Sequence, residues 1–466
     1  MDFIFSLAVV LFIFEGIIIQ CEDAPKRKRN APLSDTSGDQ PLPGDVIELI
    51  VSKTDFKTIH EAIRSYIVPP NGVVMSRILQ DHIIVICPES DVKIGEYYIR
   101  GHSYMTIGNN EGLLSFFEKF GDQVKKILFN LGENDSPRRE FTQNIIKRYG
   151  NNLTWLGIQG SHFDRFWNGI SDEENGIFFP EVKKFLIKGD CSQNNFKLNL
   201  IFPKLESFTL IGRIDDVDCL ENVKGLKELA LSTDSIKEDQ FDGIFANNKN
   251  MTVVFIQNPE MIETMHSIAK HLTKLKTLSV HSPGENFMLR ANNSPVCKLP
   301  SVTQTDFSFV SMGEAFGIGN RSFDMPNLKK LTLDGIQADD RIINFIQDFK
   351  ELEILELAVK YYNTINLIEK LKHIKEFTTP FCENEFGSLK NIFENFDKKS
   401  KLQTVKFVDF DESFHQKYEI LMKEMNTELK NSGKPTWTLS RGRDIKTNRN
   451  YLMFSREPCT SEDCNQ

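Results

Sequence analysis

Apolar residues recur at a fixed spacing from about residue 113 onward. One apolar position is followed by a second three residues later and by a third two residues after that, as in "FPKLESFTL", "MPNLKKLTL" and "FKELEILEL". Because one residue separates the second position from the third, each copy predicts a strand with one buried face. Twelve copies begin 21 to 29 residues apart. They are Val124/Ile127/Phe129, Leu153/Leu156/Ile158, Val182/Phe185/Ile187, Leu205/Phe208/Leu210, Leu226/Leu229/Leu231, Met251/Val254/Ile256, Leu275/Leu278/Val280, Val302/Thr305/Phe307, Leu328/Leu331/Leu333, Leu352/Leu355/Leu357, Ile374/Phe377/Thr379 and Leu402/Val405/Phe407.

Amphipathic segments separate these expected strands. In Met261 to Ile268 and Arg341 to Phe349 the apolar spacing is helical, so each unit is expected to be a strand followed by a returning helix. One unit cannot cover its own apolar side, whereas stacking covers it and builds a curved array. The period and the L-x-x-L-x-L pattern are those of a leucine-rich repeat. The sequence therefore predicts an α/β fold, a leucine-rich-repeat solenoid with a curved parallel sheet and convex helices.

The expected array covers residues 113–440, and residues 441–466 form a C-terminal tail. Thr305 and Thr379 occupy positions that should be apolar, so we expect local distortion there. Before the array, residues 68–112 form a mixed connecting segment with strands expected at 73–75, 83–87 and 97–99. Residues 42–67 fit two short amphipathic helices.

The first 21 residues have the features of a signal peptide. The apolar run "FIFSLAVVLFIF" is shorter than a membrane span, and Glu15 interrupts the stretch that follows it. A membrane anchor is the alternative, since no Lys or Arg precedes the run. Residues 22–41 are rich in Pro, Ser and Asp and are expected to be a disordered linker. The basic run from Lys26 to Arg29 is a processing site, a nuclear address or a solvated surface.

Composition narrows the classes of function. A net charge of −9 argues against nucleic-acid binding, which needs a concentrated basic surface. No second hydrophobic run follows the signal, so we expect a soluble mature chain with no membrane partner. Eight cysteines are scattered singly apart from Cys459 and Cys464, and none has zinc spacing. This usage is typical of a reduced chain rather than of a disulfide framework.

No catalytic motif occurs in the sequence. The H-E-x-x-H, G-x-S-x-G and Walker patterns are absent. His266 and His271 are five residues apart, so they do not share a helix face and are poor metal partners. We therefore expect no enzymatic activity, no metal site and no cofactor.

Binding is the remaining class of function. Residues between the buried strand positions of such an array point to its concave face, where an aromatic side chain is a good interface anchor. An imperfect register, or an N-terminal segment that covers the face, would instead bury them. The residues that we expect to bind a partner protein are Trp155, Gln159, Phe255, Lys330, Asp334, Ile354, Glu356 and Lys406.

Five Asn-x-Ser/Thr triplets occur in the chain. Asn134 is disfavoured as a glycosylation site because Pro137 follows its Ser. If the chain passes through the secretory route, the candidates for glycosylation are Asn152, Asn250, Asn292 and Asn320. An Asn-rich sequence also generates such triplets by chance.

The stretch "LPGDVIELI", residues 42–50, resembles the start of an F-box, in which Leu-Pro-x-Glu/Asp is followed by apolar residues at helical spacing. The resemblance implies that Leu42, Pro43, Val46, Ile47 and Ile50 dock on the Skp-type adaptor of a cullin–RING ubiquitin ligase. It covers residues 42–67, and "AIRSYIV" stands where the family has a Val-Cys-x-x-Trp-like stretch. A helical cap that seals the first repeat fits the same pattern.

The whole architecture resembles the secreted salivary F-box/leucine-rich-repeat effectors of plant-feeding gall midges. The resemblance implies a secreted, non-catalytic protein that acts in the cytoplasm of a host cell, recruits the host adaptor and holds an unknown target on its concave face. The other hypothesis is an extracellular leucine-rich-repeat recognition protein of innate immunity or adhesion, with no link to ubiquitin. Paired cysteines would favour that hypothesis, and reduced cysteines favour the effector.

Overall fold

The computed structural model describes residues 79, 83–86, 104–107, 114, 116–118, 120–131, 136–160, 163–168, 179–189, 197–212, 218–232, 238–257, 261–282, 296–309, 323–334, 345–358, 373–380, 401–408, 415–432, 436–443 and 450–456. The chain divides into two units, residues 1–50 and 51–466, and every described residue belongs to the second. The expected signal peptide, linker and F-box-like unit lie outside the described residues. So do the strands expected at 73–75 and 97–99.

The described strands form one open, mostly parallel sheet of 16 strands, in the spatial order β17-β18-β16-β15-β14-β13-β11-β9-β8-β7-β6-β5-β4-β3-β1-β2. Only β18 pairs antiparallel, with β16 on one side and β17 on the other. The strands of this sheet are β1 (Ile83–Ile86), β2 (Tyr104–Ile107), β3 (Lys126–Asn130), β4 (Trp155–Gln159), β5 (Lys184–Lys188), β6 (Ser207–Ile211), β7 (Glu228–Ser232), β8 (Val253–Gln257), β9 (Thr277–Ser282), β11 (Gln304–Phe309), β13 (Lys330–Asp334), β14 (Ile354–Leu357), β15 (Glu376–Pro380), β16 (Thr404–Val408), β17 (Trp437–Arg443) and β18 (Asn450–Arg456). A second, two-stranded sheet pairs β10 (Cys297–Lys298) with β12 (Phe323–Asp324).

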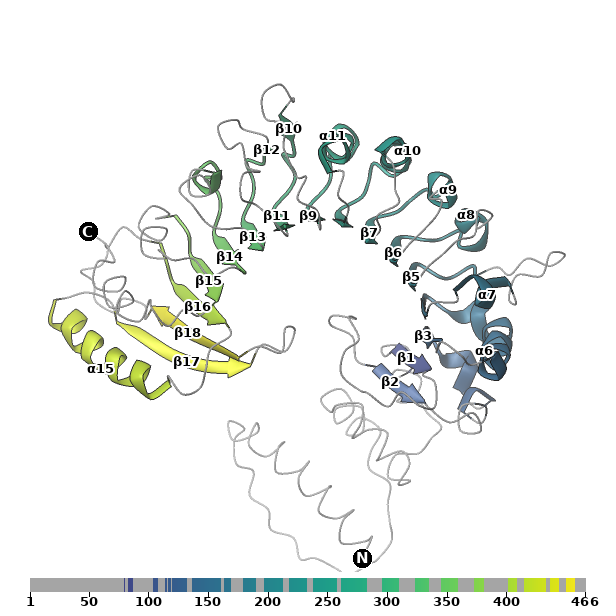
Figure 1. Cartoon of the computed structure of the whole chain (residues 1–466), viewed down its shortest axis with the longest axis horizontal. Coiled ribbons are helices and arrows are strands. Elements are labelled where there is room, and N and C mark those ends of the chain that lie inside the picture. Colours follow the sequence, from purple (N-terminus) through teal and green to yellow (C-terminus); the bar gives the residue numbers. More distant parts are fainter. Residues whose placement is uncertain are drawn as a thin grey trace, which may run out of the picture. The chain divides into compact units, whose positions relative to one another are not determined.

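Helices return the chain between parallel strands, which cannot be joined by a tight hairpin. Figure 1 shows α6 to α11 along the outer side of the curved row of strands. The helix expected from Met261 is confirmed as α11. The described helices are α6 (Ser136–Tyr149), α7 (Phe163–Asn168), α8 (Leu198–Ile201), α9 (Asp218–Glu221), α10 (Glu238–Asn247), α11 (Met261–His271) and α15 (His415–Asn431), with the short 3-10 helices η1 (Gly121–Gln123) and η2 (Gly150–Asn152).

The apolar triplets explain why these strands share one sheet. All three positions of all twelve copies are buried, including both threonines. Middle positions pair in register, so that Phe208 lies opposite Phe185 on one side and Leu229 on the other. Their side chains join one continuous core with apolar residues of the helices. Since full burial of each large apolar side chain contributes about 1.5–3 kcal/mol, these contacts between neighbouring units are the main stabilising ones.

The expected distortion at Thr305 is wrong. Thr305 pairs in regular ladders with Leu278 and Leu331, and its hydroxyl donates a hydrogen bond to the sulfur of Met325 at 3.5 Å. A buried hydroxyl is tolerated when it finds an acceptor. Near Thr379 the pairing is shorter, with three paired positions between β14 and β15 against five between β15 and β16. The Thr379 hydroxyl is buried without a hydrogen-bond partner in the described part of the chain.

The C-terminal segment completes the sheet. Residues 441–466 were expected to be a tail, but residues 450–456 form β18 between β16 and β17. The Arg456 N–H donates to the Gln403 carbonyl at 2.8 Å. On α15, the Asn426 side chain donates to the Trp437 carbonyl at 2.7 Å and accepts from the Trp437 N–H at 3.0 Å. The antiparallel pair β17–β18 and helix α15 thus cover the last apolar triplet.

A buried asparagine links two neighbouring units on the side away from the strands' exposed face. Asn248 is 2% exposed. Its oxygen accepts from the Leu226 N–H at 2.9 Å, and its nitrogen donates to the carbonyls of Val223 and Ile244 at 2.8 and 2.9 Å. Leu226 begins one triplet, and Asn248 lies just before the next. One side chain therefore satisfies the backbone where two units meet.

Replacing Asn248 by Ala should destabilise the protein, because the Leu226 N–H and two carbonyls lose their partner in a buried site. Each buried group left unsatisfied costs roughly 1–3 kcal/mol. The measurement is the free energy of unfolding in urea. Asn247→Ala is the matched control, since the exposed Asn247 side chain donates a single bond, to the Glu221 carbonyl. If the two variants lost equal amounts of unfolding free energy, the structural role of Asn248 would be contradicted.

Candidate functional site

The sheet has two faces with different environments. One face packs against the helices and carries the triplets. The other, here called the inner face, carries the alternate strand residues, because successive side chains of a strand point to opposite faces. In Figure 1, the labelled helices α6 to α11 lie on the side of the strands away from the inner face. The inner face is therefore the candidate surface for a partner.

The inner face is apolar at the end near β1. Ile83, Val85 and Leu128 are buried there and form a cluster separate from the main core, with Trp155 and Leu186 packed against it. Gly157 lies between them, and a Cβ at Gly157 would come within 2.6 Å of both Leu128 and the Trp155 ring. The indole therefore lies across the backbone of β4. Trp155 is half-buried, and much of its surface is already used within the chain.

Near the middle of the inner face, an aromatic side chain adjoins a polar group. The rings of Phe255 and His281 are 4.8 Å apart. The His281 Nε2 lies 3.1 Å from the Ser279 hydroxyl and 3.6 Å from the Asp306 carboxylate. The Ser279 hydroxyl also donates to Asp306 at 3.4 Å. Three neighbouring strands, β8, β9 and β11, thus contribute to one half-buried patch.

Charged side chains follow on β13, β14 and β16. The Lys330 ammonium lies 2.9 Å from the Glu356 carboxylate, which also accepts from the Thr332 hydroxyl at 3.0 Å. Asp334 is exposed and accepts from the Ser308 hydroxyl at 3.4 Å. The Lys406 ammonium lies 4.5 Å from the centre of the Tyr451 ring. These contacts hold the side chains in fixed positions across strands.

All eight residues expected to bind a partner occupy inner-face positions of β4, β8, β13, β14 and β16. The structure brings Lys330 together with Glu356 but keeps Trp155, Phe255 and Lys406 on separate strands. His281, Ser279 and Asp306 were not among the residues expected from the sequence to bind a partner. These three residues alternate with buried strand positions, as Phe255 does. Their place on the inner face could therefore have been predicted from the sequence. The five expected adaptor-binding residues, Leu42, Pro43, Val46, Ile47 and Ile50, lie outside the described residues.

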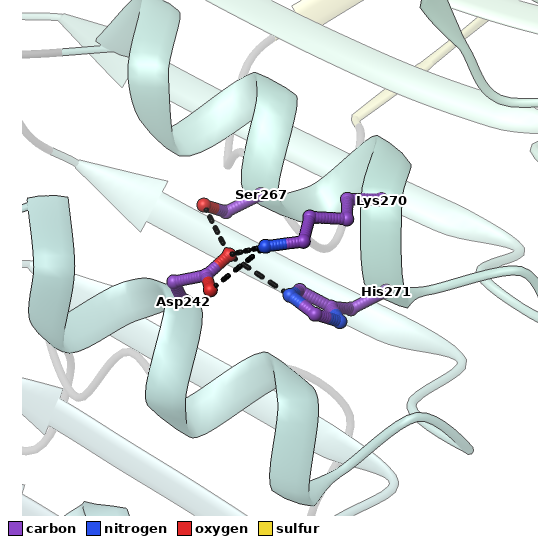
Figure 2. Close-up of polar contacts among 4 residues, drawn as sticks. All are labelled: Asp242, Ser267, Lys270 and His271. Carbon is purple, nitrogen blue, oxygen red and sulfur yellow. Dashed lines mark hydrogen bonds and ion pairs between the residues drawn. The ribbon is translucent and has the colours of Figure 1, made fainter.

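A second polar group lies on the outer side, between α10 and α11. Figure 2 shows Ser267, Lys270 and His271 of α11 directed at Asp242 of α10. The Asp242 carboxylate accepts from Ser267 at 3.1 Å and from Lys270 at 3.0 Å, and lies 2.8 Å from the His271 ring nitrogen. The hydrogen bond from Lys270, with smaller contributions from His271 and Ser267, outweighs partial burial and holds the pKa of Asp242 below its usual value. This group joins the helices of two neighbouring units.

Neither polar group has the geometry of a catalytic triad. In a triad, the two nitrogens of the imidazole contact the serine and the carboxylate separately. Around Asp242, both the serine and the imidazole bond to the same carboxylate oxygen, and no hydrogen bond joins Ser267 to His271. Around Asp306, the serine and the carboxylate both approach the same nitrogen of His281. Neither serine is therefore set up for proton transfer through histidine.

The described residues contain no group of three His, Cys, Asp or Glu side chains that could hold a metal ion. Cys297 is a free thiol that is buried in the core. Burial raises the pKa of the Cys297 thiol to about 11, so it is a poor nucleophile at neutral pH. In the part of the chain that the structure covers, no helix combines the length and apolar character needed to cross a membrane.

Two of the four glycosylation candidates lie in the turns that precede strands. Asn250 is exposed before β8, where its side-chain oxygen accepts a hydrogen bond from Lys274 at 2.8 Å. Asn152 ends η2 and is half-buried. Asn292 and Asn320 lie outside the described residues. A glycan would therefore fit more readily at Asn250 than at Asn152.

Comparisons with known proteins leave the family open. No protein-family model matches the chain, and no curated protein matches it significantly. The function must therefore be inferred from the residues of this chain.

Replacing Asp242 by Asn should lower the melting temperature at pH 7, because the carboxylate loses its cationic partners. A carboxyl whose pKa is lower in the folded state stabilises that state above its unfolded pKa, about 3.9 for Asp. This contribution is lost as the pH falls through the folded-state pKa of Asp242. The difference in melting temperature between the wild-type protein and the variant should therefore shrink towards pH 2. Asp348→Asn, which changes an exposed carboxylate, is the control. A difference that grows in acid would contradict this account.

Proposed function

We propose that the chain is a non-catalytic protein-binding protein whose inner face holds a target. In this proposal the sheet and its helices are a leucine-rich-repeat solenoid. The observation that carries it is the sheet itself: one face is entirely used by buried triplets, while the other presents a continuous row of side chains from β3 to β16. Such a row, built from many strands, offers a long surface with a fixed arrangement of groups.

Several contacts on the inner face support this proposal. Phe255 is partly exposed at the middle of the row, and its neighbours His281 and Asp306 are already positioned by Ser279. Aromatic side chains in such positions are enriched among residues that dominate binding. Because the polar neighbours are held before binding, little side-chain entropy would be lost when a partner docks.

The proposal extends to the N-terminal segment. Leu42, Pro43, Val46, Ile47 and Ile50 would dock on a Skp-type adaptor of a host ubiquitin ligase, and the inner face would hold the substrate. The effect on ubiquitin transfer would then come from proximity, since tethering raises the effective concentration of the substrate near the ligase. The chain would be secreted and would act in the cytoplasm of a host cell.

The alternative is an extracellular recognition protein that uses the same inner face without any ubiquitin link. The exposed sequon at Asn250 favours it. The two functions predict different oxidation states for the cysteines outside the described residues. Counting reactive thiols on the denatured secreted protein separates them, because paired cysteines favour the extracellular function and seven reduced ones, the number left after residues 1–21 are removed, favour the effector.

The adaptor-binding proposal is tested by affinity capture of a plant Skp-type adaptor on the chain without its signal peptide. Changing Leu42 and Pro43 together to Ala should abolish capture, because these residues would open the docking surface, while circular dichroism shows the sheet intact. The inner-face variant Phe255→Ala serves as control and should still capture the adaptor. Capture by the Leu42/Pro43 variant at the wild-type level would refute the assignment.

A further inference from the structure

The residue directly before each of twelve parallel strands lies in one continuous row along one edge of the sheet. Each of these residues after the first donates its backbone N–H to the carbonyl of the equivalent residue before the neighbouring strand. The first of these hydrogen bonds runs from Thr154 to Lys125 at 2.8 Å, and the last from Gln403 to Lys375 at 2.7 Å. Parallel strands all begin at the same edge, so these side chains lie side by side. Neighbouring strands are about 4.8 Å apart in a sheet.

Lysine occupies every second place in this row. Lysine precedes β3, β5, β7, β9, β13 and β15, while Thr, Glu or Gln precedes the intervening strands β4, β6, β8, β11, β14 and β16. We call the six lysines and the turns around them the lysine rim. They are Lys125, Lys183, Lys227, Lys276, Lys329 and Lys375. Successive rim lysines therefore recur about 9.6 Å apart along the edge.

The turns that lead into these strands add positive charge to the same edge. Among the described residues, the three residues before each of the twelve positions in the row contribute another six lysines: Lys204, Lys224, Lys249, Lys274, Lys350 and Lys401. Against these twelve lysines, the described turns carry five carboxylates, Asp122, Glu181, Glu206, Glu351 and Glu353. The edge is thus basic in a chain whose net charge is −9.

Most of this charge is not neutralised within the described residues. Lys227 pairs with Glu206 and Lys375 with Glu353, each at 2.9 Å, and Lys204 pairs with Glu181 at 2.6 Å. No carboxylate among the described residues lies within ion-pair distance of the other four rim lysines. The hydrogen bond from Lys227 lowers the pKa of Glu206, and the charges of Lys227 and Lys183 lower it further. Neighbouring lysines therefore act on the same point of the edge.

We propose that the lysine rim binds an acidic polypeptide segment in an extended conformation, with a carboxylate at every third residue. A polyproline II helix has three residues per turn and rises about 3.1 Å per residue, so every third side chain points the same way at intervals of about 9.3 Å. That interval matches the spacing of the rim lysines. Acidic segments also repel themselves and extend, which favours this conformation before binding.

The chemistry of the edge favours a polypeptide over the other polyanions. All twelve basic residues are lysines, so the guanidinium groups that pair with phosphates in two-point contacts are missing from these turns. The four residues before each of these strands include no Phe, Tyr or Trp side chain on which a nucleic-acid base could stack. None of the exposed large apolar residues, Leu114, Leu200, Val296 and Ile420, lies in these turns to enter a lipid layer.

This surface is distinct from the inner face, and the inference does not depend on the proposed function. Adjacent residues in the chain serve the two surfaces: Lys125, Lys183 and Lys329 lie on the rim, whereas Lys126, Lys184 and Lys330 begin the strands and lie on the inner face. A matched pair of triple variants can therefore separate the two surfaces with the same loss of charge.

The experiment measures binding of the full chain to two proline-rich peptides with six glutamates each. In one peptide the glutamates stand at every third residue, and in the other at every fourth, which spreads them around the polyproline II helix. We expect the first to bind more tightly, with an affinity that falls as the salt concentration rises. Changing Lys125, Lys183 and Lys329 together to Gln should weaken it by about tenfold.

The control variant changes Lys126, Lys184 and Lys330 to Gln and should bind the first peptide like the wild-type protein. Three results would overturn the proposal: equal affinity for the two peptides, loss of binding in the control but not in the rim variant, or tighter binding to single-stranded RNA or phosphatidylserine vesicles than to the peptide. Loss of binding in both variants would also overturn it if circular dichroism showed both of them folded. None of these results bears on capture of the Skp-type adaptor.

Discussion

No single strand–helix unit of this chain can bury its own apolar triplet, and the rest of the structure follows from that constraint. Phe208 is covered because Phe185 and Leu229 lie beside it on the neighbouring strands, and each of these depends in turn on the next unit. The same dependence runs from Val124 to Phe407 through one continuous core. Stability in such an array is close to a sum of contacts between nearest neighbours.

Stacking in register also creates the surfaces that could bind. Since the triplets use one face of every strand, the alternate residues are left on the other face in rows that cross the whole sheet. Since all these strands run the same way, the residues before them collect along one edge. A pattern that is dispersed in the sequence, such as a lysine before every second strand, becomes a regular line of charge only through this stacking. The inner face offers a mixture of aromatic, polar and charged groups, and the edge offers charge almost alone.

Much of this could be predicted from the sequence, because burial on one face leaves a repeating pattern. The triplets identified twelve strands, and the alternation between them placed Phe255, Glu356 and Lys406 on the inner face. Two features could not be predicted in this way. Leu128 has the pattern of an exposed inner-face residue but is buried, because Ile83 and Val85 come from a strand outside the repeating pattern. Thr305 looks like a defect, yet a sulfur acceptor from the turn before the next strand accommodates its hydroxyl.

Hydrogen–deuterium exchange on a variant with one weakened unit tests the dependence between units most directly. Leu229→Ala removes a buried side chain from the middle of the array, which costs about 2–5 kcal/mol. The account predicts faster amide exchange in β7 and also in β6 and β8, with the effect fading towards β3 and β16. Faster exchange confined to β7, with β6 and β8 unchanged, would contradict the claim that neighbouring units bury each other.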